Sequence, residues 1–361
     1  MTGFPEGRAI VYCEGAFNTP NGKTAHGLVR RTSRYRVLSV VDSRHAGRDA
    51  REVLDGKPSG IPVWDSVETA IDKARSVNGR ASHLVIGLAP DGGRLSPEAR
   101  EAVKTALRAG LDVDSGLHDF LSEDSELAGL AERMAVRLRD IRKPPRRNEL
   151  HFFTGKISEV GSFRIALLGT DSAVGKRTTA WILVDALREA GHTAELIGTG
   201  QTAWMQGVRY GIILDSLVND FVSGEIEHAI WTCWSEQLPE VMVLEGQGSL
   251  MNPAYPGGME LLAAGRPRVI VLQHAPARKH YDGFPGHPLH SLERQIRAIE
   301  TLSDRKVVAV TINHENLTPT QAREACVRIR ETTGLPAFDV LLDGASGLIE
   351  VIEPYLTRAK A

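Results

Sequence analysis

The stretch GTDSAVGKRTT, at residues 169–179, carries the residue types of a loop that binds phosphate. Nucleotide-binding loops of this kind read G-x-x-x-x-G-K-[ST], and their backbone N–H groups and lysine cradle the phosphates. Gly175 and Lys176 match the pattern, while Thr170 stands where the first glycine is expected. The apolar run FRIALLG precedes the loop and an amphipathic segment follows it, so the N-terminus of a helix would face an anion. We therefore predict a phosphate-binding loop.

The residue after the lysine decides which phosphate chemistry the loop can support. A hydroxyl group at that position normally ligates Mg²⁺. This chain has Arg177 there, and its hydroxyl groups follow at Thr178 and Thr179. A guanidinium cannot ligate a metal ion, but it can contact a phosphate directly. The loop is predicted to hold phosphate without hydrolysing Mg-ATP.

A second loop begins with Glu245, at the end of the apolar run VMVLE. A carboxylate opposite a phosphate loop could ligate a metal ion or act as an acid or base. Gly246 and Gly248 would let the backbone pass close to a ligand. The alternative is an exposed glutamate at a strand end, with glycines that only serve the turn. Asp171, inside the phosphate loop, is a second candidate base.

Polar residues after two other apolar runs and on one predicted helix are candidates for ligand binding. Gln201 and Thr202 follow the run AELIG, and their amide and hydroxyl groups suit a small polar substrate. Asp215 and Asn219 are four residues apart on a predicted helix, hence on one face. Asn313 follows the run KVVAVTI and could meet an adenine-like base.

A loop rich in Gly and Pro holds four histidines between residues 274 and 290. Their spacing matches no zinc pattern, so we expect no metal site. Arg278, Lys279 and His280 in this loop could instead contact a substrate or an anion.

Apolar runs that end in small or polar residues alternate with helical patterns along the whole chain. Such alternation implies parallel sheets with crossover helices, whose ligands bind at the carboxyl edge of the strands. The alternation is interrupted once, at RLRDIRKPPRRNEL, where Pro144 and Pro145 break any helix. We predict an α/β protein with two parallel-sheet domains, at residues 1–145 and 146–361.

The composition excludes several classes of protein. The chain has 361 residues and a formal net charge of -2, which argues against broad nucleic-acid binding. No apolar run approaches the length of a membrane span, and the first residues do not resemble a secretion signal. The three cysteines are far apart, as expected for reduced thiols. We expect a cytoplasmic protein with neither nucleic-acid nor membrane partners, and a homodimer from the fold class.

Several motifs together resemble those of a known family. GTDSAVGK and LEGQGS are similar to the phosphate loop and the Glu-Gly loop of dethiobiotin synthetase. LVIGLAPDGGRL, DSGLHDFL, HFFTGKI, GTDSAVGKRTT, GTGQTAWMQG and LEGQGSLMNP more closely resemble the DgcN-type D-glutamate N-acetyltransferase family. The resemblance implies a Rossmann-like N-terminal domain and a P-loop NTPase-like C-terminal domain. It also implies acetyl transfer from acetyl-CoA to the amine of a D-amino acid, with D-glutamate as the first candidate.

Coenzyme A carries a pyrophosphate and a 3′-phosphate, so a phosphate cradle can bind it without hydrolysis; ATP with Mg²⁺ is the less favoured ligand. The candidate residues are, for catalysis, Asp171 and Glu245; for the cofactor, Thr170, Ser172, Gly175, Lys176, Arg177, Thr178, Thr179 and Asn313; and for the substrate, Gln201, Thr202, Arg209, Asp215, Asn219, Gln247 and Arg278. Two alternatives stay open. One is an ATP-dependent ligase of the dethiobiotin synthetase type, and the other is a non-catalytic protein that binds CoA or a nucleotide.

Overall fold

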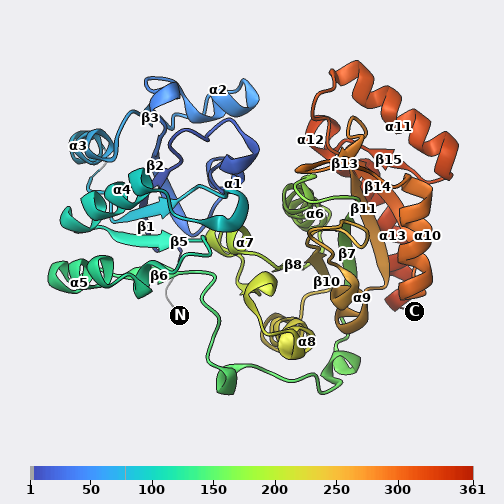
Figure 1. Ribbon diagram of the computed structural model, residues 1–361. Helices are drawn as coiled ribbons and strands as arrows, with labels where there is room; N and C mark the ends of the chain where they lie inside the picture. The colour runs from blue at the N-terminus through green and yellow to red at the C-terminus, as the bar shows by residue number, and fades with distance from the viewer. Residues whose placement is uncertain (1–3, 78, 361) are drawn as a thin grey trace. The chain divides into compact units, whose positions relative to one another are not determined.

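The computed structural model describes residues 4–77 and 79–360 (Figure 1). The chain divides into two compact units. The first extends to Pro144 and also includes Gln201–Val208, and the second comprises Pro145–Gly200 and the chain from Arg209 onward. The short segment Gln201–Val208 lies inside the predicted second domain, yet it packs with the first unit.

The first unit is built on a six-stranded sheet whose paired strands run parallel, in the order β3-β2-β1-β4-β5-β6. Its strands are β1 (Gly7–Tyr12), β2 (Tyr35–Val41), β3 (Val63–Trp64), β4 (His83–Ile86), β5 (Asp112–Ser115) and β6 (Leu138–Asp140). Its helices are α1 (Lys23–Arg30), α2 (Ala50–Asp55), α3 (Val67–Val77), α4 (Pro97–Arg108) and α5 (Ser125–Met134). This is the strand order of the Rossmann fold, and it confirms the predicted Rossmann-like domain.

The start of α4 shows how the sequence sets an element boundary. The Ser96 hydroxyl accepts a hydrogen bond from the N–H of Ala99, and Pro97 occupies the first helical position, as predicted. The buried face of α4 then packs with α3 and α5 over side chains of the sheet such as Ile10 and Leu84.

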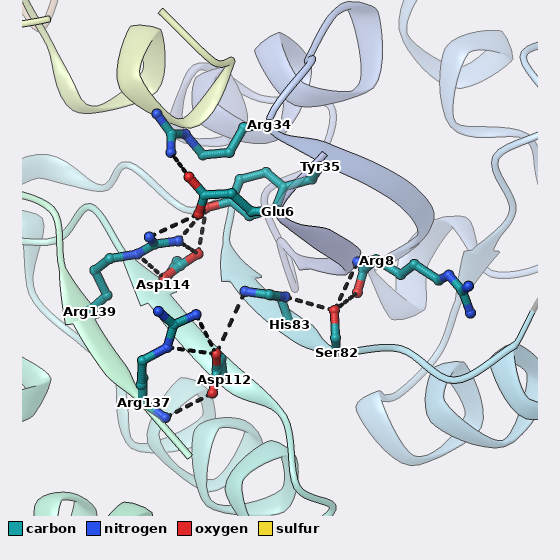
Figure 2. Close-up of polar contacts among 10 residues, drawn as sticks. All are labelled: Glu6, Arg8, Arg34, Tyr35, Ser82, His83, Asp112, Asp114, Arg137 and Arg139. Atoms are coloured by element: carbon teal, nitrogen blue, oxygen red, sulfur yellow. Dashed lines mark hydrogen bonds and ion pairs between the residues drawn. The ribbon is translucent and has the colours of Figure 1, made fainter. Parts of the chain in front are cut away.

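Charged side chains, two of them buried and two partly buried, pair with one another where several strands of this sheet begin. Figure 2 shows Glu6 paired with both Arg34 and Arg139, and Asp114 paired with Arg139. The Tyr35 hydroxyl donates a hydrogen bond to Asp114. Two carboxylates and two guanidiniums thus neutralise one another, which is what allows charged groups to remain buried.

The helix α7 (Gln201–Met205) is attached to this charged cluster. The guanidinium of Arg34 lies 3.6 Å from the centroid of the Trp204 ring, and that of Arg139 lies 4.6 Å from it. Arg34 also donates to the Trp204 carbonyl at 2.7 Å, and the hydroxyls of Thr24 and Thr202 are 2.9 Å apart. These contacts make α7 an integral part of the first unit.

The second unit is built on a seven-stranded parallel sheet in the order β15-β14-β11-β7-β10-β8-β9. Its strands are β7 (Phe163–Gly169), β8 (Ala194–Gly198), β9 (Tyr210–Gly211), β10 (Val241–Glu245), β11 (Val269–His274), β14 (Val307–Ile312) and β15 (Ala337–Phe338). Its helices are α6 (Lys176–Glu189), α8 (Asn219–Gln237), α9 (Met259–Gly265), α10 (Leu292–Ser303), α11 (Pro319–Thr333), α12 (Val340–Asp343) and α13 (Ser346–Lys360). The two parallel sheets confirm the predicted α/β class.

Two local expectations need correction or detail. Asp215 and Asn219 do not share a helix face, because Asp215 lies in a single 3₁₀ turn, Leu214–Ser216, and α8 begins only at Asn219. The histidine-rich loop forms a small antiparallel hairpin, β12 (His280–Tyr281) and β13 (Phe284–Pro288). Among the described residues, no helix is long and apolar enough to cross a membrane.

Candidate active site

The phosphate loop connects the central strand of the second sheet to a helix. β7 ends at Gly169 and α6 begins at Lys176, as the sequence predicts for a strand-turn-helix. Gly175 has a φ of +97°, a conformation that only glycine adopts without strain. A Cβ on Gly169 would lie 2.8 Å from Nζ of Lys176, so a side chain there would displace that lysine. Gly175 is therefore required by the path of this loop, and Gly169 by the position of Lys176.

Lys176 joins the phosphate loop to the loop that follows β10. Its ammonium group donates to the carbonyl of Asp171 at 2.8 Å and to the carbonyl of Gly248 at 2.8 Å. The side chain is buried, so the positive charge is held at a fixed place beside the N-terminus of α6. The charge and the helix dipole act in the same direction on an anion.

Asp171, a predicted base, is engaged on both of its carboxylate oxygens. Oδ1 accepts from the N–H of Ser172 at 2.7 Å and from Nδ2 of Asn252 at 2.7 Å. Oδ2 accepts from Nη1 of Arg278 at 2.8 Å and from the N–H of Asp282 at 2.9 Å. The carboxylate is fully buried. We call these five residues the Asp171 cluster; its geometry suits a structural anion better than a proton acceptor.

Arg278, a predicted substrate ligand, is the cation of this cluster. Besides Asp171, it pairs with Glu315 through both Nε and Nη2, the latter at 3.0 Å, and donates to the Ser172 carbonyl at 2.7 Å. Burial alone would lower the pKa of Arg278, but the ion pairs with Glu315 and Asp171 raise it above its usual value. Arg278 thus fixes the phosphate loop from the side of β11 and β14.

Glu245, the other predicted base, ends β10 next to the phosphate loop and is buried. Thr199 holds it at two points: its N–H donates to Oε2 at 3.3 Å, and its hydroxyl donates to the Glu245 carbonyl at 2.8 Å. Burial raises the pKa of Glu245, and the charge of Arg177, the Thr199 N–H and the charge of Lys176 oppose that shift. A buried carboxylate with a raised pKa beside two cations has the properties of a general base.

Two of the threonines predicted to bind the cofactor form hydrogen bonds with side chains at the end of β11. The Thr170 hydroxyl lies 2.9 Å from Nδ1 of His274, and the Thr179 hydroxyl donates to Oε1 of Gln273 at 2.7 Å. Burial and the charge of Arg278 lower the pKa of His274 to about 4, which makes its ring neutral at pH 7. Both hydroxyls are therefore held in place by the end of β11.

The other predicted cofactor residues lie on the loop or beside it. Arg177 and Thr178 are in the first turn of α6 and are partly buried. The Ser172 hydroxyl donates to Asp282 at 3.3 Å. Asn313 follows β14, and its Nδ2 would lie 3.7 Å from a Cβ added to Gly175. Asn313 is therefore at the phosphate loop, as its position after the strand predicts.

The residues predicted to bind the substrate are not gathered at one place. Gln247 is in the loop after Glu245, where its Nε2 donates to the Thr199 carbonyl. Arg209 pairs at 3.2 Å with Glu236, near the C-terminus of α8, whereas Asn219 begins that helix. The two ends are about 25 Å apart along the helix axis, since each residue adds 1.5 Å. Arg209 and Asn219 therefore cannot contact one small molecule together.

The remaining three substrate candidates have different surroundings. Asp215 is exposed in the turn after β9. Gln201 and Thr202 are buried in the first unit, as are Ala203 and Met205 of α7.

Several residues of the site were assigned no role from the sequence. Gln273 and His274 end β11, which pairs with β7 so that Gln273 is opposite Gly169. Their place at the end of an apolar strand was the signal that could have identified them. Asn252 lies in the motif LEGQGSLMNP and Asp282 in the histidine-rich loop, whereas Glu315 comes from a loop without a recognisable pattern. Only the folded chain brings these three residues to the phosphate loop.

Comparisons with known proteins agree with this architecture. Residues 151–349 match the domain described as "Domain of unknown function (DUF1611_C) P-loop domain", and residues 43–144 match "Domain of unknown function (DUF1611_N) Rossmann-like domain". A crystal structure of a DUF1611 family protein from Anabaena variabilis is similar over 97% of this chain and 100% of that one, with 29% identity and a TM-score of 0.88.

Two curated relatives carry the name D-glutamate N-acetyltransferase. The protein from a Pseudoalteromonas species is 32% identical over 279 residues, which are 74% of this chain and 80% of the relative. The protein from Tritonibacter scottomollicae is 31% identical over 291 residues, which are 79% of this chain and 84% of the relative. These similarities confirm the resemblance seen in the motifs: the chain belongs to the DUF1611 family, in which a Rossmann-like domain precedes a P-loop domain.

Proposed function

We propose that this protein transfers the acetyl group of acetyl-CoA to the amine of a D-amino acid, with D-glutamate as the first substrate to test. The observation that carries the proposal is the buried carboxylate of Glu245, held beside the charges of Lys176 and Arg177 at a phosphate loop. The names of the two curated relatives support the same reaction.

The phosphate loop fits the phosphates of CoA in the chemistry of its donors. The N-terminus of α6, Lys176 and Arg177 offer backbone N–H groups and two cationic side chains. Arg177 replaces the hydroxyl that would ligate Mg²⁺, so the loop favours a phosphate held by cations alone. Acetyl-CoA would supply the activated acetyl group as a thioester.

Glu245 would remove the proton that makes the substrate amine unreactive. An amine is protonated at neutral pH and must lose a proton before its nitrogen can attack the thioester carbon. As the C–N bond forms, the C–S bond breaks and the CoA sulfur leaves as a thiolate. The nitrogen then loses its second proton, which the thiolate takes up to give free CoA. The raised pKa of Glu245 brings its affinity for a proton closer to that of an amine than an ordinary carboxylate allows. Asp171 is not suited to this role, because four donors already engage its oxygens.

The first experiment measures free thiol and ADP with either acetyl-CoA or Mg-ATP and a panel of D- and L-amino acids. We expect thiol release with acetyl-CoA and D-glutamate, and no ADP. Release of ADP without thiol would favour the ATP-dependent ligase, and release of neither would favour a non-catalytic binding protein.

The second experiment tests Glu245 itself. Glu245→Gln should lower kcat by about 10²–10⁴-fold, the usual contribution of a general base. In the wild type, kcat/KM should fall as the pH drops through the raised pKa of Glu245, because protonated glutamate cannot accept a proton. Glu195→Gln is the control, since Glu195 is partly exposed on β8 and pairs with Arg188. A Glu245→Gln enzyme with wild-type kcat would rule out this base.

A further inference from the structure

Two loops of the second unit that carry aromatic rings are anchored on the phosphate loop at Asp171. In the loop after β10, Asn252 donates to Oδ1 of Asp171 at 2.7 Å, and its own Oδ1 accepts from the N–H of Tyr255 at 2.7 Å. In the hairpin of β12 and β13, the N–H of Asp282 donates to Oδ2 of Asp171 at 2.9 Å. The same buried carboxylate therefore fixes the position of both loops.

The rings of Tyr255, Phe284 and His287 form what we call the aromatic row across these two loops. The ring centroids of Tyr255 and Phe284 are 6.5 Å apart, and those of Phe284 and His287 are 6.2 Å apart, both in edge-to-face contact. Tyr255 is 48% exposed, His287 is exposed and Phe284 is partly exposed. The aromatic row thus offers ring surface to a ligand beside the phosphate loop.

The aromatic row is also connected to the residues proposed for binding and catalysis. Tyr255 belongs to the loop that follows Glu245 at the end of β10. Within that loop, the Gly248 carbonyl accepts from Nζ of Lys176 at 2.8 Å, and the N–H of the next residue, Ser249, donates to the Tyr255 carbonyl at 3.2 Å. One loop therefore carries the proposed base, a partner of the phosphate-binding lysine and the first ring of the aromatic row.

We propose that the aromatic row binds the pantetheine arm of CoA, which joins the pyrophosphate to the thioester. This inference rests on the proposed function. The arm is uncharged and carries two methyl groups and several methylenes, so aromatic rings can cover it and no cationic partner is required. A glutamate acceptor, by contrast, has two carboxylates that favour cationic partners.

The order of the strands is consistent with this assignment. The adenine end of the cofactor is expected at Asn313, which follows β14, whereas Tyr255 is in the loop after β10. In the sheet, β14 and β10 lie on opposite sides of β7, the strand that leads into the phosphate loop. With the pyrophosphate at that loop, the adenine and the pantetheine arm would leave it in opposite directions.

The test measures binding without an amine, so that no turnover occurs. Isothermal titration calorimetry on the full-length protein compares CoA, dephospho-CoA and ADP. Dephospho-CoA and ADP carry the same adenosine and pyrophosphate, so they differ by the pantetheine arm. Tyr255→Ala and Phe284→Ala should each weaken the binding of CoA and of dephospho-CoA by about tenfold, because each removes apolar surface that covers the arm, and should change ADP affinity by less than about twofold.

Three observations separate this effect from damage to the fold. Tyr255→Ala retains the two hydrogen bonds that hold residue 255, since its backbone N–H and carbonyl make them. Tyr255→Phe keeps the ring and should bind all three ligands as the wild type does. Phe152→Ala is the control, because it removes a ring that is 68% exposed on the chain before β7, and all three affinities should stay unchanged.

Two results would overturn the pantetheine site. One is an unchanged CoA affinity in either alanine variant. The other is an equal loss of affinity for dephospho-CoA and ADP, which would assign the rings to the adenine or the pyrophosphate instead. In both cases binding of CoA by the wild type would leave the proposed function standing. If the wild type bound neither CoA nor dephospho-CoA, the proposed function itself would be wrong, and this inference with it.

Discussion

Asp171→Asn is the substitution that best separates support of the phosphate loop from proton transfer. An asparagine keeps one oxygen and replaces the other with an NH₂ group, so two of the four hydrogen bonds in the Asp171 cluster cannot form. Each hydrogen bond to a charged group contributes about 1.5–3 kcal/mol. Arg278 keeps its ion pair with Glu315, which favours the lower end of that range. We expect the free energy of unfolding to fall by about 3–4 kcal/mol.

The assays follow from that expectation. Urea unfolding, monitored by tryptophan fluorescence, measures the stability, and calorimetry measures acetyl-CoA affinity, which should weaken because the loop loses its support. At saturating acetyl-CoA, kcat should fall less than about tenfold, since Glu245 is intact. Asp282→Asn is the matched control, because it removes a nearby carboxylate charge that also acts on Arg278 but leaves the backbone N–H of residue 282 able to reach Asp171.

One result would refute this reasoning. If Asp171→Asn kept wild-type stability and acetyl-CoA affinity while kcat fell more than about 10²-fold, Asp171 would be the base. A loss of the acidic limb of the pH profile in this variant would support the same conclusion.

Three further predictions concern the loop and its neighbours. Lys176→Ala should weaken acetyl-CoA binding by about 1.5–3 kcal/mol, the contribution of a charged hydrogen bond to phosphate. If a calorimetric titration showed an unchanged affinity, Lys176 would not bind the cofactor. The free energy of unfolding should fall by about 1–3 kcal/mol as the pH drops from 6.5 to about 4, because His274 takes up a proton at a higher pH in the unfolded chain than in the folded chain. When urea unfolding is measured over the same pH range, the His274→Gln variant should lack this contribution to the fall. Gly175 and Gly191 have φ angles of +97° and +93°, so Gly175→Ala and Gly191→Ala should each lower the free energy of unfolding by about 1–3 kcal/mol. Only Gly175→Ala should weaken acetyl-CoA binding, and equal losses of affinity in the two variants would contradict the proposed site.

The sequence predicted the local parts of this site better than its assembly. The loop before α6 and the position of Glu245 follow from apolar runs that end at glycine or a polar residue, a signal contained within a few neighbouring residues. The role of Asp171 could not be read in the same way, because its partners Asn252, Arg278 and Asp282 are 81 to 111 residues away. The residue type Asp is the same whether its carboxylate is free or accepts four hydrogen bonds.

The helical pattern was least reliable between residues 209 and 219. The polar spacing of Asp215 and Asn219 fits a helix face, but the chain forms a separate turn after β9, where the Leu214 N–H donates to the Thr199 carbonyl. A single long-range hydrogen bond of this kind outweighs the weak local preference for a helix.

The incorporation of α7 into the first unit affects how the protein can be made. A ribosome synthesises the first 144 residues well before Gln201–Val208, and at about 5–20 residues per second the intervening stretch takes roughly 3–13 s. During that interval the nascent first unit lacks Trp204, the aromatic cover of Arg34 and Arg139. A fragment truncated near residue 150 would remain permanently in this incomplete state. An expression fragment of the first unit should therefore carry residues 201–208 in trans or through an engineered linker if it is to fold as it does in the whole chain.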